Sequence, residues 1–286
     1  MVLRRGARWA AAVLTAVCLV LLLGRGEPDG GAPGAGRAAS GAPRKAVPDR
    51  VATWNICNPC GGLEKDFGRA TAIAAAAPQV IGLQEACVRD VEQIRSYLKD
   101  VYGLEYRVAY GSVLRNWNRC GGLPWRPGGF GQAILSAAPM TDRVSVGYPH
   151  GGSENRGYLA VTTLVGGRSV RVFNTHLAER RQEGVRVSQV KVLAAEVARH
   201  DRAIVLGDFN AVPYAAELTP MWALATDVDP GCRPSDAEAC TPTTDWNSKF
   251  DYVFLRGAIT PRAHRIRPSA YSDHHMLTTD LKLGQG

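Results

Sequence analysis

Short apolar segments recur along the chain from about residue 48 onward, and polar segments containing glycine or proline separate them. Runs of roughly four to eight residues rich in valine, isoleucine, leucine and aromatic residues are typical of buried strands. The pattern predicts strands over residues 50–56, 79–84, 105–110, 131–136, 158–165, 169–175, 203–206, 252–255 and 276–281. Gly166 and Gly167 separate two of these strands and indicate a tight hairpin, so antiparallel pairing is expected.

Two other segments repeat their apolar residues at steps of three and four, the spacing of an amphipathic helix. The two stripes consist of Val88, Val91, Ile94, Leu98 and Val101, and of Val190, Leu193, Ala194 and Val197. Many strands with few helices between them favour an α+β fold in which helices cover packed sheets, rather than a doubly wound parallel sheet.

The first 23 residues have the order of an export signal. Arg4, Arg5 and Arg8 precede an apolar run over residues 9–23, which is shorter than the roughly 18 residues of a membrane-spanning helix. This order predicts a secreted, extracellular protein. A short amino-terminal anchor on the outer face of the plasma membrane stays an alternative, because no clean small-residue cleavage site follows Leu23 directly.

Residues 24–47 are mostly glycine, alanine, proline and arginine, with almost nothing to bury. Such a composition predicts a flexible linker. The remaining stretch, residues 48–286, contains no repeat and no second change of composition, and its length fits one large domain.

The composition excludes a disordered tract and a polytopic membrane protein. The 286 residues are 45% hydrophobic and 21% charged, with a formal net charge of +8. Residues 1–44 hold six of the 34 basic and two of the 26 acidic side chains, so the rest of the chain carries only +4. A polyanionic partner is therefore permitted by the charge but is not required by it.

Six cysteines lie outside the apolar leader, at positions Cys57, Cys60, Cys87, Cys120, Cys232 and Cys240. An even number in an exported chain favours disulfides, and fifteen connectivities are possible for six cysteines. Cys232 and Cys240 bracket one polar loop and are predicted to pair. A zinc site built on Cys57 and Cys60 is the alternative, although no second pair of ligands accompanies it.

Polar residues follow the predicted strands at the points where strand gives way to loop. They are Asn55 after VATW, Glu85 after VIGLQ, His176 after VRVFNT, Asp208 and Asn210 in GDFN, Asp251 before YVFL, and Asp273 and His274 in SDHH. Carboxylates, amides and imidazoles without a Ser-His-Asp or Cys-His signature suit a hard cation with oxygen ligands and a phosphoryl group.

Taken in order, these segments resemble the endonuclease/exonuclease/phosphatase superfamily of metal-dependent phosphoesterases, which includes pancreatic-type deoxyribonucleases. The resemblance runs from about Val51 to Leu283 through TWN, LQE, GQAILS, RGYL, NTHL, GDFN, FDYVF and SDHH. It implies a four-layered αββα sandwich of two packed, mixed and mostly antiparallel sheets, with the active site at one end. It also implies a metal-dependent phosphoric ester hydrolase.

The resemblance assigns three residues to the metal. Glu85 corresponds to the principal Mg²⁺ ligand, Asn55 holds the metal or a bound water beside it, and Asp273 is a further metal or water ligand. Mg²⁺ is the expected cofactor, with Mn²⁺ and Ca²⁺ as alternatives, because hard oxygen donors suit these ions.

The resemblance assigns catalytic roles to five other residues. Asp208 orients and deprotonates the attacking water, and Asn210 donates to the phosphoryl oxygens. His274 contacts the phosphate or acts as general acid or base, with Asp251 fixing its tautomer. His176 is a second donor to the phosphate. The family's pairing of the Asn55 and Glu85 strands further implies disulfides Cys57–Cys87 and Cys60–Cys120.

The substrate is predicted from residues 113–129, where Trp117 and Trp125 alternate with Arg119 and Arg126. Interleaved aromatic and guanidinium groups favour nucleic acid over a lipid headgroup or a small metabolite. Arg156 is a further candidate for a phosphate contact. A sphingomyelinase-like phosphodiesterase, a phosphomonoesterase and a catalytically silent binding module stay as alternatives, and the sequence shows no sign of an obligate protein partner.

Overall fold

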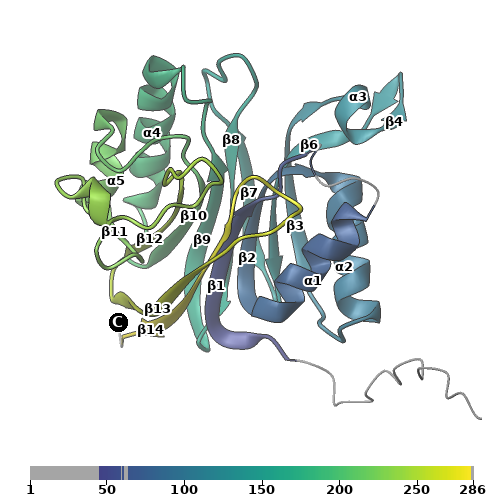
Figure 1. The fold of residues 1–286 in the computed structure, drawn as a ribbon, viewed down its shortest axis with the longest axis horizontal. Coiled ribbons are helices and arrows are strands. Elements are labelled where there is room, and N and C mark those ends of the chain that lie inside the picture. Colours follow the sequence, from purple (N-terminus) through teal and green to yellow (C-terminus); the bar gives the residue numbers. More distant parts are fainter. Residues whose placement is uncertain (1–44, 59, 61–63, 285–286) are drawn as a thin grey trace, which may run out of the picture. The chain divides into compact units, whose positions relative to one another are not determined.

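A computed structural model of the protein describes residues 45–58, 60 and 64–284. The predicted export signal over residues 1–23 lies outside the described residues, as does the predicted linker up to residue 44. The first strand, β1, spans Val47–Asn55, so regular structure begins where the apolar pattern starts (Figure 1). Among the described residues, none of the helices has the length and apolar character needed to cross a membrane.

Two six-stranded sheets form the centre of the fold. The first has the order β13-β14-β1-β2-β6-β3, with β2 Pro78–Cys87, β3 Arg107–Arg115, β6 Gly129–Ser136, β13 Ile259–Arg267 and β14 Met276–Leu283. The second has the order β11-β12-β10-β9-β8-β7, with β7 Thr141–Gly147, β8 Gly157–Val165, β9 Arg168–His176, β10 Ala203–Asp208, β11 Thr226–Asp227 and β12 Asp251–Arg256. The pairs β1–β2 and β9–β10 are parallel and the other neighbours are antiparallel, as predicted.

Helices cover the outer faces of both sheets (Figure 1). Helices α1 Lys65–Ala76 and α2 Val88–Asp100 pack on the first sheet, and α4 Glu183–Val197 and α5 Thr219–Leu224 pack on the second. A short helix α3, Trp117–Cys120, and the ribbon β4 Gly122–Leu123 with β5 Arg126–Pro127 lie in the loop between β3 and β6. The 3₁₀ turns η1 Ala216–Leu218 and η2 Ala237–Ala239 complete the described elements.

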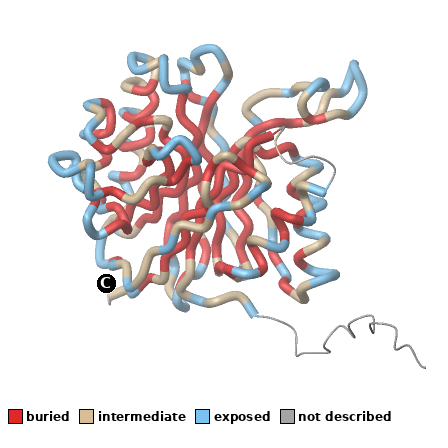
Figure 2. The backbone as a smooth tube through the Cα atoms, viewed as in Figure 1, coloured by how far each residue is buried: buried red, intermediate tan, exposed pale blue. Residues whose placement is uncertain are grey.

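Three apolar layers hold this sandwich together. One layer lies between the sheets and contains Val51, Ile134, Val172, Leu206 and Leu277, all with their side chains fully or nearly fully buried. The other two lie between each sheet and its helices. The burial of the central strands is visible as continuous red in Figure 2. The predicted α+β class and four-layered sandwich are therefore confirmed.

The predicted strands are all present, and three further long elements escaped the sequence analysis. Strands β7 and β13 lie at the ends of their sheets, where β7 is mostly exposed and β13 is mostly half-buried, so they lack a continuous apolar run. Helix α1 buries mainly small residues such as Ala70 and Ala74, which give a weak apolar signal. The hairpin at Gly166 and Gly167 is as predicted, and both residues have the positive φ that its turn requires.

The disulfide pairing corrects the prediction for four cysteines. Cys57 is bonded to Cys60 and Cys87 to Cys120, so the predicted Cys57–Cys87 and Cys60–Cys120 bonds are wrong. The predicted Cys232–Cys240 bond is confirmed. Because both sulfurs of Cys57 and Cys60 are used in a disulfide, the alternative zinc site has no thiolates to bind the metal.

The local backbone explains the observed pairing. After β1 the chain turns back at once, and the amide of Cys60 donates to the carbonyl of Cys57 over 2.6 Å. Cys87 lies at the start of α2, opposite Phe130 of β6. The segment between β3 and β6 that carries Cys120 therefore passes Cys87, with the Cα atoms of the two cysteines 5.3 Å apart.

Candidate active site

The second sheet brings three of the predicted residues into one row at its edge. The register places Asp208 of β10 beside His176 of β9 on one side and beside Asp251 of β12 on the other. All three are buried. Gly207 allows β10 to approach β9 closely here, because a Cβ at this position would lie 2.3 Å from the carbonyl oxygen of Thr175.

The first sheet supplies Asn55 and Glu85 from two parallel strands. Asn55 ends β1 and pairs in register with Gln84, so Glu85 follows directly at the same edge. The pairing of β2 with β6 is irregular between Leu83 and Ala86, and Glu85 has φ of 52°. A bulge with a left-handed non-glycine residue re-aims a side chain, which is typical of a functional position.

Asn55 connects the two sheets at the site. Its Nδ2 lies 3.0 Å from Oδ2 of Asp208 and 3.4 Å from Oε1 of Glu85, and its Oδ1 accepts from the backbone amide of Cys57. The amide group therefore faces the carboxylates with its NH₂ side. Asn55 positions the two carboxylates as a hydrogen-bond donor in this arrangement, whereas the sequence analysis assigned it to the metal.

His274 lies between two carboxylates. Its Nδ1 is 2.9 Å from Oδ2 of Asp251, and its Nε2 is 3.8 Å from Oδ2 of Asp208. Its backbone is fixed by the indole of Trp54, which donates to its carbonyl, and by Ser272, which accepts from its amide. Burial alone would lower the pKa of His274, but Asp251 and Asp208 outweigh burial and raise it from 6.5 to about 10.

The two buried aspartates differ in their pKa. Burial would raise the pKa of Asp208, but the charge of His274 and the hydrogen bonds from His176 and Asn55 outweigh burial and hold that pKa well below its usual range. Burial raises the pKa of Asp251, and His274 offsets only part of this effect. Near neutral pH the proton of the Asp251–His274 pair therefore lies on the imidazole, and Asp208 is ionised.

His176 is held from two sides. Its Nε2 lies 3.3 Å from Oδ2 of Asp208 and 3.0 Å from Nδ2 of Asn210, and its Nδ1 lies 2.7 Å from Nη1 of Arg156. Asn210 has φ of 50°, and its backbone amide donates to Oδ1 of Asp208 over 2.8 Å. This tight turn places the Asn210 side chain next to the row of buried residues.

Arg156 is engaged within the protein. Its Nη1 also lies 3.0 Å from Glu154, whose other carboxylate oxygen is 2.7 Å from Nη1 of Arg119. The Arg119 guanidinium lies 4.4 Å above the ring of Phe130. Arg156 and Arg119, both predicted as substrate contacts, are therefore parts of one chain of contacts that ends at His176.

The remaining predicted residues lie outside the row of His176, Asp208 and Asp251. The carboxylate of Asp273 lies within 4.8 Å of the sulfurs of Cys57 and Cys60. Trp117, Trp125 and Arg126 are exposed in the loop between β3 and β6, with Trp125 at 80% exposure. Within the part of the chain that the structure describes, these three residues make no hydrogen bond or ion pair with His176, Asp208 or Asp251.

Comparison with known proteins identifies the family. Residues 52–274 match the profile of the Endonuclease/Exonuclease/phosphatase family. The chain belongs to this family. Its members are metal-dependent phosphoester hydrolases, so the expected enzyme class is confirmed. A search of curated proteins found no match.

Solved structures of this family share the fold. An endonuclease/exonuclease/phosphatase from Beutenbergia cavernae is 23% identical with a TM-score of 0.66, over 82% of this chain and 71% of that one. D. rerio TDP2 complexed with a single-strand DNA product is 19% identical with a TM-score of 0.63, over 82% and 98%. A Bacteroides thetaiotaomicron mannosyl-6-phosphatase is 16% identical with a TM-score of 0.62, over 82% and 99%.

The residues at the site fit the divalent metal that the family implies. One carboxylate oxygen of Asp208, one of Asp251 and a ring nitrogen of His274 lie within 4.8 Å of one another. Oδ1 of Asp251 is buried without a hydrogen-bond partner among the described residues. Three carboxylates, with that of Glu85, face one imidazolium. Because this excess of negative charge repels a phosphate, a cation is needed to admit one.

Several positioning residues were missed from the sequence. Nδ2 of Asn174 donates to the carbonyls of Leu83 and Ala133, and its Oδ1 accepts from Gln84 over 2.6 Å. These buried contacts join the strand of His176 to the strand of Glu85. Both polar residues stand inside motifs of the family, NTHL and LQE, and a buried polar residue within an apolar strand is the signal that could have found them.

Arg69 was also missed, because α1 itself was not predicted. Its guanidinium is fully buried and donates to the carbonyls of Ile56, Cys57, Cys60 and Tyr271. It thereby holds together the loop after Asn55 and the loop before Asp273. Trp246 was missed as well, and its ring centroid lies 5.3 Å from that of His274.

Proposed function

We propose that the protein is a secreted, Mg²⁺-dependent phosphodiesterase that cleaves nucleic acid by attack of water on phosphorus. The observation that carries this proposal is the position of Asp208. Its Oδ2 is an ionised acceptor within 3.3 Å of Nε2 of His176 and 3.8 Å of Nε2 of His274. An acceptor for water is thus flanked by two donors for phosphoryl oxygens.

Asp208 acts mainly by orienting the water. Its lowered pKa keeps it ionised at physiological pH, so it is always available to accept a hydrogen bond from the nucleophile. A carboxylate with so low a pKa is a weak base. Asp208 therefore takes up the proton only as the new P–O bond forms and the water becomes acidic.

His274 supplies the positive charge at the phosphate. Asp251 holds Nδ1, so the Nε2–H of the imidazolium is free to donate to a phosphoryl oxygen or to the leaving oxygen. His176 and Asn210 lie on the other side of Asp208 and add donors there. Mg²⁺ held by Glu85 would neutralise charge on the phosphate and polarise it.

Nucleic acid is the favoured substrate for two reasons. Trp117 and Trp125 are 51% and 80% exposed beside Arg126, so they are available for stacking and for phosphate contacts. TDP2, which shares this fold, carries single-stranded DNA in its crystal structure. Arg119 is occupied by Glu154 and Phe130 and is left out of the proposed contacts.

A panel of substrates tests this proposal. The purified, oxidised protein should cleave DNA or RNA in Mg²⁺, and cleavage should stop with EDTA. Turnover of sphingomyelin or of phosphomonoesters, with nucleic acid left intact, would overturn the substrate. Silence on every phosphoester, in protein whose folding is verified by circular dichroism, would instead support the binding-module alternative.

The proposal that the protein is secreted is supported by the apolar leader and by the disulfides. The leader precedes a domain with three disulfides, which form and persist in oxidising compartments. Expression of the full chain should place the protein in the culture medium without its first residues, as read by amino-terminal sequencing. Recovery only in the membrane fraction, with residues 1–23 intact, would favour the anchor.

A further inference from the structure

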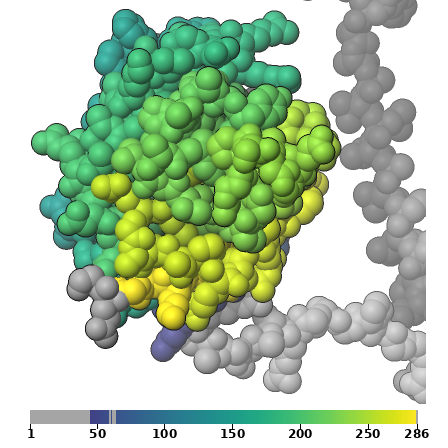
Figure 3. Space-filling model, turned by 90° about the vertical axis from the view of Figure 1, so that its left-hand side faces the viewer, coloured from purple at the N-terminus to yellow at the C-terminus, as the bar shows by residue number. Residues whose placement is uncertain are grey.

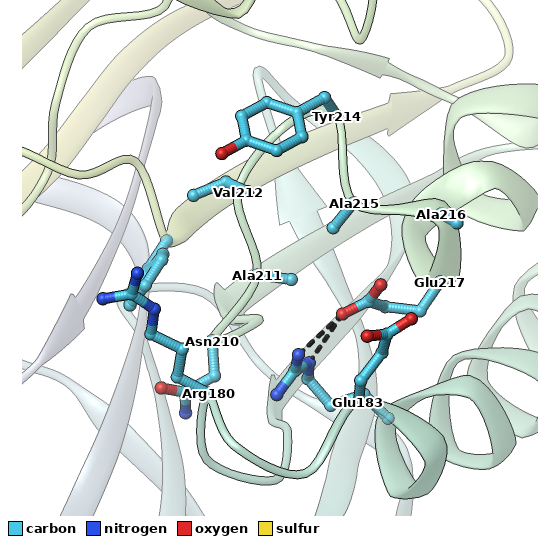
Figure 4. A pocket seen from close by; sticks show the side chains of 11 residues that line it. Arg180, Glu183, Asn210, Ala211, Val212, Tyr214, Ala215, Ala216 and Glu217 are labelled. Carbon is cyan, nitrogen blue, oxygen red and sulfur yellow. Dashed lines mark hydrogen bonds and ion pairs between the residues drawn. The ribbon is translucent and has the colours of Figure 1, made fainter.

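A groove extends from the catalytic residues along the second sheet's side of the molecule. Two adjoining hollows of about 360 Å³ and 440 Å³ share Arg180, Asn210 and Phe250. Each volume is within the range of small-ligand sites. The first hollow is drawn in Figure 4, and Figure 3 views the side of the molecule built by this part of the chain.

The groove begins at the catalytic centre. Asn210 lines both hollows, and its side chain lies 3.0 Å from Nε2 of His176. Trp246 lines the second hollow, and its ring stands almost perpendicular to that of His274 at 5.3 Å. A phosphodiester bound at His176 and His274 would therefore extend one of its two substituents into the groove.

The walls of the groove carry exposed aromatic and cationic groups. Tyr214 is 67% exposed and Trp246 is 45% exposed, and the side chains of Arg180 and Arg181 are exposed between them and α4. In Figure 4, Arg180 lies next to Asn210 while Tyr214 borders the same hollow. Small residues at positions 211, 215 and 216 leave the space between them open.

The charges in the groove are not evenly distributed. Arg186 and Glu217 form a buried ion pair at 2.7 Å and cancel each other. Glu183 lies beside Glu217 in Figure 4, away from Asn210. Glu179 accepts hydrogen bonds from Ser153 and Gln182. The second hollow is therefore lined by two guanidinium groups, those of Arg180 and Arg181, and by one carboxylate, that of Glu179, so its lining has a net positive charge.

We propose that this groove binds the single-stranded nucleic acid segment adjoining the scissile phosphodiester. Trp246 and Tyr214 stack on successive bases, and Arg180 and Arg181 contact the backbone phosphates. This assignment rests on the proposed function, because it names the substrate that the same site takes. Unpaired bases are required, since the flat faces of bases in a duplex are already stacked on one another.

The arrangement of the whole site favours a polymer over a small ester. The loop that carries α3 and β4 lies on one side of the sandwich's upper edge, and helices α4 and α5 lie on the other (Figure 1). Exposed aromatic and arginine side chains are present both in the loop that carries α3 and β4 and in the groove next to α4. A chain that continues past the cleaved bond in both directions would contact both.

The test compares two substrates across matched variants. The substrates are a single-stranded oligothymidylate and bis(4-nitrophenyl) phosphate, which is too small to fill the groove. We expect Arg180→Ala, Tyr214→Ala and Trp246→Ala each to lower kcat/KM for the oligonucleotide at least about fivefold more than for the small diester. Arg199→Ala is the control, because Arg199 is exposed on the same side of the sheet and, among the described residues, its side chain forms an ion pair with Glu196 alone.

Salt dependence supplies a second readout. Fluorescence anisotropy would measure oligonucleotide binding by Glu85→Gln protein, with and without Arg180→Ala, between 50 and 200 mM salt. In a plot of the logarithm of the binding constant against the logarithm of the salt concentration, Arg180→Ala should make the slope shallower by about 0.7. Equal losses on both substrates, or an unchanged slope, would overturn this inference. So would variants impaired on sphingomyelin vesicles but not on the oligonucleotide. Failure of the wild type to hydrolyse even the small diester would overturn the proposed function itself.

Discussion

At the scale of single residues, two buried carboxylates set the charge of His274, the proposed donor to the phosphate. Asp251 is fully buried, and its Oδ2 contacts Nδ1 of His274. Without a counter-charge, burial would favour the neutral imidazole. With Asp251 and Asp208 nearby, the pKa of His274 is about 10, so the imidazolium persists through neutral pH and is lost as the pH rises through that value.

Replacing Asp251 by Asn should shift this titration. Because burial then acts with less opposition, the pKa of His274 falls, and the alkaline limb of kcat/KM against pH moves from about 10 toward neutral. We expect a loss of roughly 10²-fold at pH 9. Asp245→Asn is the control, since Asp245 is exposed and contacts His275, the neighbour of His274 in the sequence. An alkaline limb that stays in place would show that the His274 charge is not required.

Glu154 offers a second residue-scale prediction. It joins Arg119 to Arg156, and Arg156 contacts His176. Without Glu154, Arg156 is no longer held beside His176, so we expect Glu154→Gln to lower kcat about fivefold, equivalent to about 1 kcal/mol in the barrier, with little change in KM. Steady-state kinetics on a small diester measures this. Glu92→Gln, which removes an exposed ion pair on α2, is the matched control. A change in KM alone would instead place Glu154 at the substrate.

At the scale of elements, disulfides pin the loops around a core that packs without them. Cys87–Cys120 closes a loop with a sequence separation of 33 and fixes α3 against β6, whereas Cys232–Cys240 spans only 8. Loop-closure entropy assigns roughly 3–4 kcal/mol to the first bond and about 2.5 kcal/mol to the second.

Replacing each pair by serines should therefore lower the free energy of unfolding more for Cys87–Cys120. Urea denaturation of the two double variants under oxidising conditions measures the difference. An equal or reversed order would mean that the loop carrying α3 is held by other contacts, such as the Arg119–Glu154 pair.

The sequence predicted elements where burial is continuous and failed where it is not. Strands such as β10, with every residue buried, produce an unmistakable apolar run. The edge strand β7 is exposed along nearly its whole length, and α1 is built on alanines, so neither has a strong periodic signal. The apolar pattern of a sequence reflects which residues are buried, and an exposed edge strand has few buried residues to produce such a pattern.

At the scale of the whole molecule, the site exists because two sheets meet. The row of His176, Asp208 and Asp251 belongs to one sheet and the pair of Asn55 and Glu85 to the other. The hydrogen bond between Asn55 and Asp208 links residues 153 positions apart. In the sequence, the candidate residues could be found because they stand at the ends of predicted strands. Their roles were taken from the resemblance to the family.

Pairings within loops could not be predicted in the same way. The resemblance implied the two packed sheets correctly, but the cysteine pairs that it implied are wrong, and it did not imply that Arg119 meets Glu154. Those contacts depend on short backbone turns, such as the one that returns Cys60 to Cys57. The substrate is the least predictable feature for the same reason, since the aromatic and cationic residues lie on loops.

The most direct test of the account is metal-dependent hydrolysis of bis(4-nitrophenyl) phosphate by the purified, oxidised protein. We predict turnover in Mg²⁺, its loss with EDTA and its return when Mg²⁺ is added in excess. Glu85→Gln should reduce turnover at least about 10²-fold with the fold intact, while Glu105→Gln, on the exposed surface, should leave it unchanged. Turnover that survives EDTA, or a fully active Glu85→Gln protein, would contradict the account.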